Sequence, residues 1–282
     1  MVFSDILLKP QGVYRPSKED VFTVLWKMMK VNVEEFIAAP VEYFTCHHGQ
    51  VAIYGEHHPV AQAKGIVIMA HGFAQNRYIL IPQEQIFRKL GFSTILFDQR
   101  AFGESEETVC TFGMEESKDI KILTDYVRQH IDASLPIILF GVSMGAATVM
   151  NALEHTDDVY AVIEDCGFSS FQEVVPTLFQ SFGLGRWHEG EERLLAMATK
   201  KLGFTWADHN PYNVIKKSRV PLCIFHGTKD SVIPVAHGQR IYEASVHKDS
   251  LLALFQGKEH ALCILEEERY EQVLRQFFKG LL

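Results

Sequence analysis

The chain has 282 residues, of which 47% are hydrophobic and 22% charged, and its formal net charge at pH 7 is −8. A chain of this length can bury roughly 75% of the surface of its unfolded form, so it needs no disulfide or metal to fold. The net negative charge and the absence of a block of basic residues argue against a nucleic-acid partner.

The cysteines and the N-terminus bear on the cellular compartment. The five cysteines are scattered and no two form a Cys-x-x-Cys pair, a pattern that suits a reducing compartment and offers no zinc site. Residues 1–14 do not join a basic segment to a long apolar core, as a signal peptide would. No apolar run approaches the roughly 18 residues that span a bilayer. We therefore expect a cytoplasmic protein with neither a metal ion nor a cofactor.

Residues 1–40 are predicted to form an N-terminal helical extension, with a helix over Val21–Ile37. Its apolar residues favour packing onto the domain or over its active site. Interfacial attachment to a membrane is the alternative, because Lys18, Lys27 and Lys30 accompany the apolar residues. An antiparallel hairpin is expected next, with strands at 41–45 and 50–54.

From Gly65 onward apolar runs alternate with helical patterns, which is typical of a parallel sheet covered by helices on both faces. Strands are predicted at Gly65–Ala70, Ser93–Phe97, Pro136–Phe140, Val159–Glu164, Pro221–His226 and Leu251–Phe255. Helices are predicted at Asn76–Leu90, Glu115–His130, Met144–Glu154, Val235–Ser245 and Ile264–Lys279. This α/β core comprises residues 41–166 and 211–282.

The core is interrupted by residues 167–210, which we predict to form a small helical cap. Two helical stretches, 171–181 and 189–202, replace the single crossover helix expected there. Ligands of open α/β sheets bind at the carboxyl ends of the strands, and an insertion leaving that edge covers the crevice. Its aromatic residues favour an apolar acyl or aryl group in the substrate. The candidates for substrate contact are Phe171, Phe179, Trp187 and Trp206.

Residues 141–145 read Gly-Val-Ser-Met-Gly, between an apolar run and an alanine-rich helical pattern. G-x-S-x-G in this setting predicts a sharp strand-to-helix turn that holds a serine nucleophile, Ser143, clear of the backbone. The N–H of Met144, at the start of the helix, then points toward an anion formed on the substrate.

A serine nucleophile needs a base and an acid, which should follow it in the order acid, then histidine. Asp230 follows the strand predicted at 221–226, and His260 lies on the loop after the last strand. They are our candidates for acid and base. Asp165 or Glu164 could supply the carboxylate instead, and the cap contains His209 as a weaker alternative base.

The strand at 65–70 ends in His-Gly-Phe, where the chain turns outward. The N–H of Phe73 is the expected second donor of an oxyanion hole, beside that of Met144. His71 is expected to hold this loop in place. Arg77 is expected to be solvated, with contact to a substrate carboxylate as the alternative.

In their order and spacing, these motifs resemble those of the α/β-hydrolase superfamily. The resemblance runs from about Val41 to the C-terminus and rests on residues 71–73, 141–145, 226–230 and His260. It implies the α/β-hydrolase fold, a mostly parallel sheet with helices on both faces and a helical cap. Within the superfamily the chain is similar to capped serine esterases, cinnamoyl-ester-hydrolase-like and lysophospholipase-like. It departs from the frequent D-x-R-G-x-G-x-S pattern at Ala101, which replaces the first glycine.

The sequence thus predicts a serine hydrolase that cleaves a small-molecule carboxylic ester by way of an acyl-enzyme. A thioesterase, or an amidase acting on small peptides, is the alternative that uses the same residues. A non-catalytic ligand-binding protein on the same fold is a third possibility. The sequence leaves the oligomeric state and the acyl and alcohol groups of the substrate open.

Overall fold

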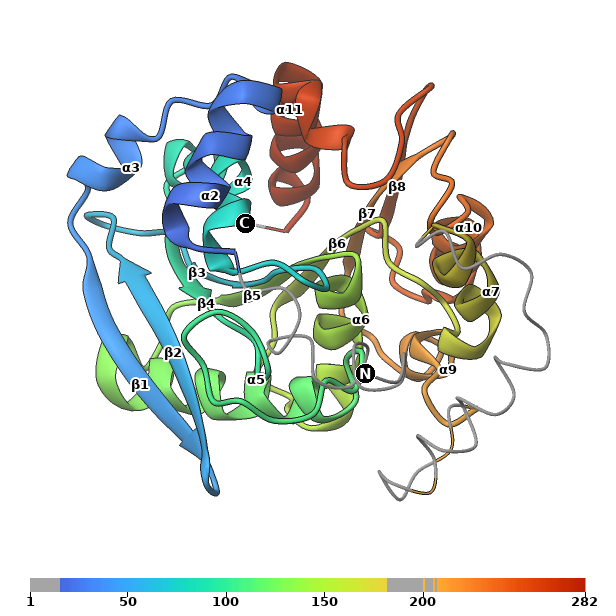
Figure 1. Cartoon of the computed structure of the whole chain (residues 1–282), viewed down its shortest axis with the longest axis horizontal. Coiled ribbons are helices and arrows are strands. Elements are labelled where there is room, and N and C mark those ends of the chain that lie inside the picture. The colour runs from blue at the N-terminus through green and yellow to red at the C-terminus, as the bar shows by residue number, and fades with distance from the viewer. Residues whose placement is uncertain (1–15, 182–199, 201–204, 206, 282) are drawn as a thin grey trace.

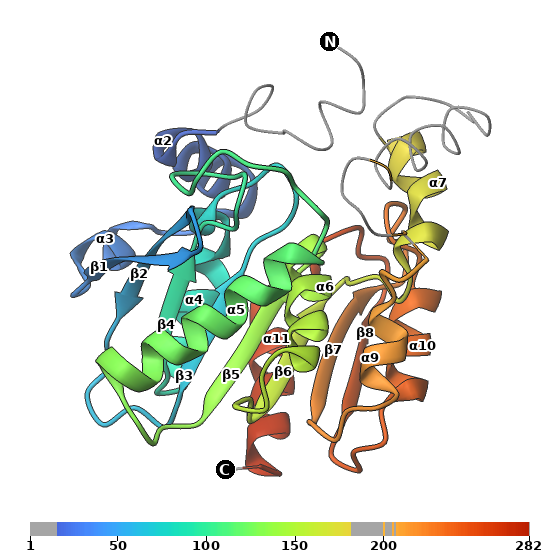
Figure 2. The ribbon, with the colours of Figure 1, turned by 90° about the horizontal axis from the view of Figure 1, so that it is seen from below.

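The computed structural model of the chain describes residues 16–181, 200, 205 and 207–281. Within this part of the chain, eight strands form a sheet in the order β1-β2-β4-β3-β5-β6-β7-β8, with helices on both faces (Figure 1, Figure 2). The strands are β1 (Glu42–His48), β2 (Val51–His58), β3 (Ile66–Ala70), β4 (Ser93–Phe97), β5 (Ile137–Val142), β6 (Ala161–Asp165), β7 (Leu222–Gly227) and β8 (Leu251–Phe255).

The β1–β2 hairpin joins the edge of an otherwise parallel sheet. β2 pairs antiparallel with both β1 and β4, whereas the pairs from β4 through β3 to β8 are all parallel. Every residue of β3, β4, β5, β6 and β7 is buried, as expected for parallel strands covered on both faces. The predicted fold class and the predicted strands are confirmed.

Two apolar layers enclose the sheet. Alternate residues of β3 show the division, since Val67 and Met69 belong to one cluster and Ile66 and Ile68 to the other. The first cluster includes side chains of α2 (Lys18–Val24), α3 (Glu34–Ala38), α4 (Ile81–Lys89) and α11 (Glu267–Lys279). The second includes side chains of α5 (Glu115–Tyr126), α6 (Met144–Asn151), α9 (Pro211–Ile215) and α10 (Ala236–Ala244).

The prediction of one continuous N-terminal helix over 21–37 is wrong, because the segment is divided into α2, a π turn and α3. α2 begins earlier, at a Ser17 cap, and continues as a π turn over Leu25–Met29 that ends at Lys30. Lys30 adopts a left-handed conformation with φ 57°, which stops the helix. Asn32 then accepts a hydrogen bond from the N–H of Glu34 (2.9 Å) and starts α3 separately.

The first predicted cap helix is present as α7 (Phe171–Ser181), which follows β6. Arg240 of α10 donates to Glu173 of α7 (2.5 Å), and Ser169 Oγ, just before α7, lies 2.9 Å from His237 Nδ1 of α10. The second predicted cap helix, 189–202, lies outside the described residues except for Lys200. The division into core and cap therefore stays a prediction.

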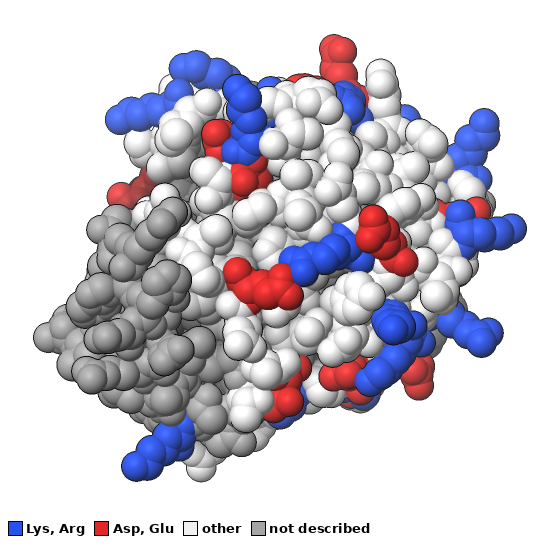
Figure 3. Space-filling model, turned by 90° about the vertical axis from the view of Figure 1, so that its right-hand side faces the viewer, with Lys and Arg blue, Asp and Glu red and all other residues white. Residues whose placement is uncertain are grey.

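Charge is mixed on the molecular surface viewed from the β8 side. Acidic and basic side chains alternate there without a large field of one sign among the residues drawn in white, blue and red (Figure 3). None of the described helices combines the length and the apolar character that crossing a bilayer requires.

Candidate active site

Ser143 lies in a strained turn between β5 and α6. Its φ of 56° and ψ of −117° are rare for an L residue, and Met144 begins the helix directly after it. The turn leaves no room for side chains on either flank. A Cβ on Gly145 would lie 2.1 Å from the carbonyl oxygen of Ala70, and one on Gly141 would lie 2.1 Å from the carbonyl oxygen of Gly145. Both glycines are therefore required by the close approach of backbone.

The structure brings the three residues predicted as nucleophile, base and acid into one hydrogen-bonded chain. His260 Nε2 lies 2.9 Å from Ser143 Oγ, and His260 Nδ1 lies 2.8 Å from Asp230 Oδ2. The other carboxylate oxygen accepts from the N–H groups of Val232 (3.0 Å) and Ile233 (2.8 Å). With Nδ1–H donating to the carboxylate, Nε2 is left to accept the serine proton. The Asp230 carboxylate is fully buried, whereas the His260 imidazole is partly exposed, so a solute can reach the side of the imidazole that faces Ser143.

The alternative carboxylates have other partners. Asp165 accepts from the Tyr270 hydroxyl (3.1 Å), and Glu164 accepts from the N–H of Gly167 (2.7 Å). Burial raises the pKa of Asp165 to about 7 and that of Glu164 to about 8, against the opposing effect of these hydrogen bonds. Neither carboxylate is the one hydrogen-bonded to His260.

The alternative base, His209, is fully buried and has partners other than the serine. Its Nε2 is 2.6 Å from the carbonyl oxygen of Phe112, and its Nδ1 is 3.2 Å from the Asn151 amide. Burial lowers the pKa of His209 to about 4, so it is held neutral. The imidazole of His209 also packs against the aromatic rings of Phe168 and Phe171, so its role is structural.

The loop after β3 runs beside the serine. A Cβ on Gly72 would lie 3.5 Å from Ser143 Cβ, so the backbone that leads to Phe73 passes next to the nucleophile. His71 is buried and fixes this loop, as predicted: its Nδ1 donates to the Gly72 carbonyl (2.7 Å), and its Nε2 accepts from the N–H of Gln99 (3.0 Å). The assignment of Phe73 and the first α6 residue as oxyanion donors stays a prediction.

An apolar wall adjoins the serine and the Phe73 loop. Its buried members include Phe102, Phe112, Met144, Phe168, Phe171, Val174 and Ile233, and the half-buried Phe73, Val109, Leu178 and Val232 pack against them. The rings of Phe73 and Phe112 are stacked with centroids 5.0 Å apart. Of the predicted substrate contacts, Phe171 is a buried part of this wall, whereas Trp187, Trp206 and the Phe179 side chain lie outside the described residues.

Arg77 is not solvated, contrary to the prediction. Its guanidinium is buried and pairs with Glu56 (2.9 Å), Glu104 (2.5 Å) and Asp98. Glu56 lies on β2 and Asp98 follows β4, so the pairing partners are distant in sequence and close only in the folded sheet. Arg77 fixes the loop beyond β4 and offers no free charge to a substrate carboxylate.

Two neighbours of the candidate acid were not singled out as supports by sequence. His226, on β7, is not one of the three residues in the Ser143–His260–Asp230 hydrogen-bonded series. It holds the loop after β7 in place, because its Nε2 lies 2.8 Å from the carbonyl oxygen of Ile233 and 3.6 Å from the Asp230 carboxylate. Cys166 places its thiol with the Asp230 carboxylate and the His260 imidazole, all three atoms within 4.8 Å of one another. The only sequence signal was their position at the ends of adjacent strands.

The atoms of Cys166, Asp230 and His260 are also a possible ligand set for a metal ion. Burial raises the pKa of the Cys166 thiol well above its usual range, which opposes the thiolate that a metal needs. The carboxylate and imidazole are already hydrogen-bonded to each other. The arrangement therefore suits proton transfer at His260 better than metal binding.

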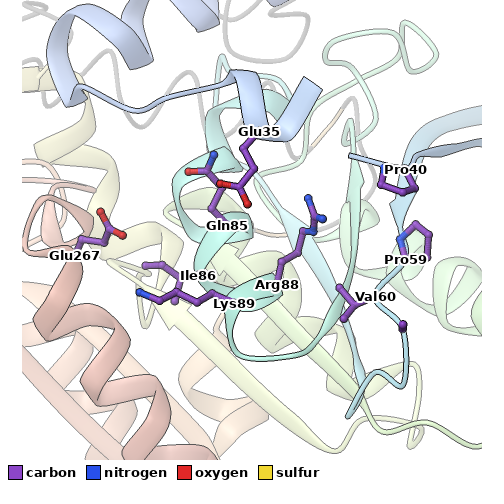
Figure 4. Close-up of a pocket in the computed structure, with 10 residues that line it drawn as sticks. Glu35, Pro40, Pro59, Val60, Gln85, Ile86, Arg88, Lys89 and Glu267 are labelled. Carbon is purple, nitrogen blue, oxygen red and sulfur yellow. The ribbon is translucent and has the colours of Figure 1, made fainter. Parts of the chain in front are cut away.

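A hollow of about 580 Å³ lies beside α4, and Ser143 is not among the residues that line it (Figure 4). Its charged lining residues are Glu35, Arg88, Lys89 and Glu267. Lys89 pairs with Glu271 (2.6 Å), and Arg88 lies 3.6 Å from Glu84. Because charges of both signs line it and its cations have protein partners, the hollow does not select a ligand of one charge.

The comparisons agree with this architecture. A model of the alpha/beta hydrolase fold family matches residues 65–189. The solved structure of the esterase Pf2001 of Pyrococcus furiosus is similar with a TM-score of 0.72, at 18% identity, over 88% of this chain and 95% of that chain. The chain thus has the α/β-hydrolase fold. At this level of identity the likeness to Pf2001 is one of fold.

The chain also has relatives in sequence. It is 26% identical to the uncharacterized protein YqkD of Bacillus subtilis over 237 residues, covering 81% of this chain and 76% of YqkD. It is 25% identical to the uncharacterized protein YfhR of Escherichia coli over 205 residues, covering 71% of this chain and 64% of YfhR. The chain thus resembles each of these relatives over more than two thirds of its own length.

Proposed function

We propose that this α/β hydrolase is a serine hydrolase that cleaves a carboxylic ester, with Ser143 as nucleophile, His260 as base and Asp230 as the acid that orients it. One observation carries the proposal: the hydrogen bonds of 2.9 Å and 2.8 Å that link these three side chains. A serine hydroxyl is a weak nucleophile until an oriented base removes its proton, which is the role this arrangement fits.

In the proposed reaction, Ser143 Oγ attacks the ester carbonyl carbon while His260 Nε2 takes the hydroxyl proton. Asp230 stabilises the imidazolium that forms. The tetrahedral intermediate expels the alcohol, which receives the proton from His260, and leaves an acyl group on Ser143. Water then attacks the acyl carbon with His260 again as base, and the acid and the free serine are released.

The oxyanion of both tetrahedral intermediates would be bound by the N–H groups of Phe73 and Met144. The proximity of Gly72 to Ser143 and the position of Met144 in the first turn of α6 support this assignment. In comparable sites, one such donor contributes roughly 2.7–4 kcal/mol of transition-state stabilisation.

The acyl or aryl part of the substrate is proposed to be apolar. The support is the wall of aromatic and aliphatic side chains next to the serine, with Phe73, Leu178 and Val232 half-buried at its surface. The similarity of the fold to that of the esterase Pf2001 favours an ester over other carbonyl substrates. We also propose a cytoplasmic location, since all five cysteines are free and buried.

The test is Ser143→Ala with a short p-nitrophenyl ester. We expect kcat/KM to fall by roughly 10⁴-fold or more, because the variant keeps the fold and loses the nucleophile. A fluorophosphonate probe should label the wild-type protein at Ser143 and fail to label the variant. Ser134→Ala, on a surface loop, is the matched control and should behave as wild type. An unchanged rate in Ser143→Ala would overturn the proposal.

A thioesterase or an amidase would use the same triad and is separated by substrate. Matched ester, thioester and amide substrates with one acyl group should give the highest kcat/KM for the ester. A non-catalytic ligand-binding protein would react with neither the probe nor any of the three substrates.

A further inference from the structure

The end of the N-terminal helix presents large apolar side chains and lysines to solvent. Trp26 is 61% exposed and Met28 is 73% exposed, and Val24, Lys27 and Lys30 are exposed beside them. We call these five residues the Trp26 strip. Contiguous exposed apolar side chains of this size mark an interaction site rather than ordinary surface.

The strip is fixed to the protein by the other side of the same segment. Leu25 is fully buried and Met29 packs against the same apolar cluster, which also includes Val21 and Phe36. The π turn over Leu25–Met29 widens the helix between these two anchors. Residues 26, 27 and 28 therefore all face outward in the folded protein.

The charge of the strip indicates the kind of partner. From residue 21 to residue 33 the sequence contains two lysines and no carboxylate. Neither Lys27 nor Lys30 forms an ion pair with any residue that the structure describes. The acidic residues of α2 lie in its first turn, at the opposite end of the helix. The strip thus combines an apolar surface with two lysines that form no ion pair within the described part of the chain.

The helix that leads into the strip, α2, lies at the end of the molecule that holds the candidate active site. Figure 2 shows α2 at the same end as the carboxyl ends of the parallel strands and the start of α6. In Figure 1 both α2 and α6 lie on the side that faces the viewer. α2, which leads into the strip, therefore lies at the edge of the sheet from which Ser143 projects.

We propose that the Trp26 strip docks the protein onto a lipid bilayer that bears anionic headgroups. Tryptophan and methionine side chains enter the boundary between headgroups and acyl chains, while neighbouring lysines extend to the lipid phosphates. The inference extends to the substrate and there rests on the proposed function: the ester that the protein cleaves is one that the lipid surface presents. The docking itself is independent of catalysis.

The test measures sedimentation of the full chain, carrying Ser143→Ala to prevent turnover, with vesicles of phosphatidylcholine alone or mixed with phosphatidylglycerol. We expect binding to the mixed vesicles, weaker binding to phosphatidylcholine alone, and weakening by salt. Trp26→Ser with Met28→Ser should lower the affinity at least tenfold. Lys27→Glu with Lys30→Glu should lower it by a similar factor and remove the preference for phosphatidylglycerol.

Matched controls change equally exposed residues elsewhere. Tyr43→Ser and Val246→Ser remove side chains that are 68% and 64% exposed, and Lys216→Glu with Lys217→Glu reverses two exposed charges on another surface. All three should bind vesicles as strongly as the parent. Circular dichroism of each variant verifies the fold. The proposal is overturned if the parent ignores mixed vesicles, if the strip variants bind as well as the controls, or if the strip variants only convert a dimer to a monomer.

Failure of this inference and failure of the proposed function give different results. Vesicle binding without ester hydrolysis would contradict the serine hydrolase alone. Hydrolysis of soluble esters without vesicle binding would contradict the docking surface alone. Where both hold, hydrolysis of a vesicle-borne ester should fall at least tenfold in the Trp26→Ser, Met28→Ser variant, whereas hydrolysis of a soluble ester should not change.

Discussion

Ser143 is held in a backbone conformation that costs about 1–3 kcal/mol for a residue with a side chain. The strain persists because Gly141 and Gly145 allow the turn to close against neighbouring backbone. It aims Oγ at His260 from the start of α6. The proposed nucleophile therefore occupies a position where stability and function oppose each other.

Ser143→Gly should make the protein more stable than Ser143→Ala by about 1 kcal/mol, because only glycine adopts a positive φ without steric strain. Both variants lose the hydroxyl, so both should lose ester hydrolysis and the comparison isolates the backbone. Urea unfolding of the two proteins measures the difference in the free energy of unfolding. Equal stability would mean that the turn stores no strain.

Asp230→Asn should lower kcat by roughly 10⁴-fold, because an amide cannot hold the imidazole with Nδ1–H donating and Nε2 accepting. Asp165→Asn is the matched control. Asp165 is buried close by but is hydrogen-bonded to Tyr270 rather than to His260. We expect it to change kcat less than about tenfold. Rates on one p-nitrophenyl ester decide between the two carboxylates, and a larger effect of Asp165→Asn would reassign the acid.

At the scale of the elements, the β5–α6 turn depends on contact between backbones. Gly145→Ala should destabilise the protein by about 3 kcal/mol or more, since its Cβ would overlap the carbonyl of Ala70 at 2.1 Å and neither strand nor helix can shift freely. Gly280→Ala is the control, because its nearest described atom lies at 3.6 Å. Thermal unfolding of both variants measures the effect; similar melting temperatures would contradict the close approach.

The elements that the sequence predicts well are those with local signals. The strands Ser93–Phe97 and Leu251–Phe255 are found at the predicted residues, because an apolar run bounded by turn residues needs no distant partner to be recognised. The positions of Asp230 and His260 follow from apolar runs of the same kind, since Asp230 lies on the loop after β7 and His260 on the loop after β8. The order of strands and helices along the sequence was thus enough to predict both the fold and the candidate triad.

The features that the sequence did not predict depend on tertiary contacts. Arg77 is buried because Glu56 and Asp98, on other strands, surround it in the folded protein. The helix break at Lys30 relies on a left-handed residue and a π turn that let Leu25 and Met29 reach the core together. Neither has a periodic signature. Hydrophobic periodicity therefore gave one long helix where there are two short ones.

At the scale of the whole molecule, parallel strands that end at one edge concentrate buried carboxyl groups there. Glu164 and Asp165 end β6, and Asp230 follows the neighbouring β7. All three are buried, and the negative charge of Asp230 adds to the effect of burial in raising the pKa of Glu164 and of Asp165. Asp230 accepts two backbone N–H groups and the imidazole, whereas Asp165 has one oxygen without a hydrogen-bond partner among the described residues.

This cluster predicts how stability depends on pH. Burial raises the pKa of Asp165 from 3.8 to about 7. Between these values the unfolded chain has lost a proton that the native protein keeps, so the free energy of unfolding falls as pH rises and levels off above about 7. Asp165→Asn removes this contribution. The variant should therefore gain stability relative to wild type between pH 4 and pH 7, by on the order of 3 kcal/mol.

Urea unfolding of wild type and Asp165→Asn at several pH values from 4.5 to 8 measures this difference. Glu164, whose pKa is raised to about 8, makes the free energy of unfolding fall with rising pH in both proteins. Loss of the Tyr270 hydrogen bond shifts the variant by a constant at every pH, so only the slope is informative. Glu268→Gln, at an exposed position, should run parallel to wild type. If the free energy of unfolding of Asp165→Asn also ran parallel to that of wild type, Asp165 would already be ionised in the native protein. The sheet edge behind His260 would then bear the negative charge of Asp165.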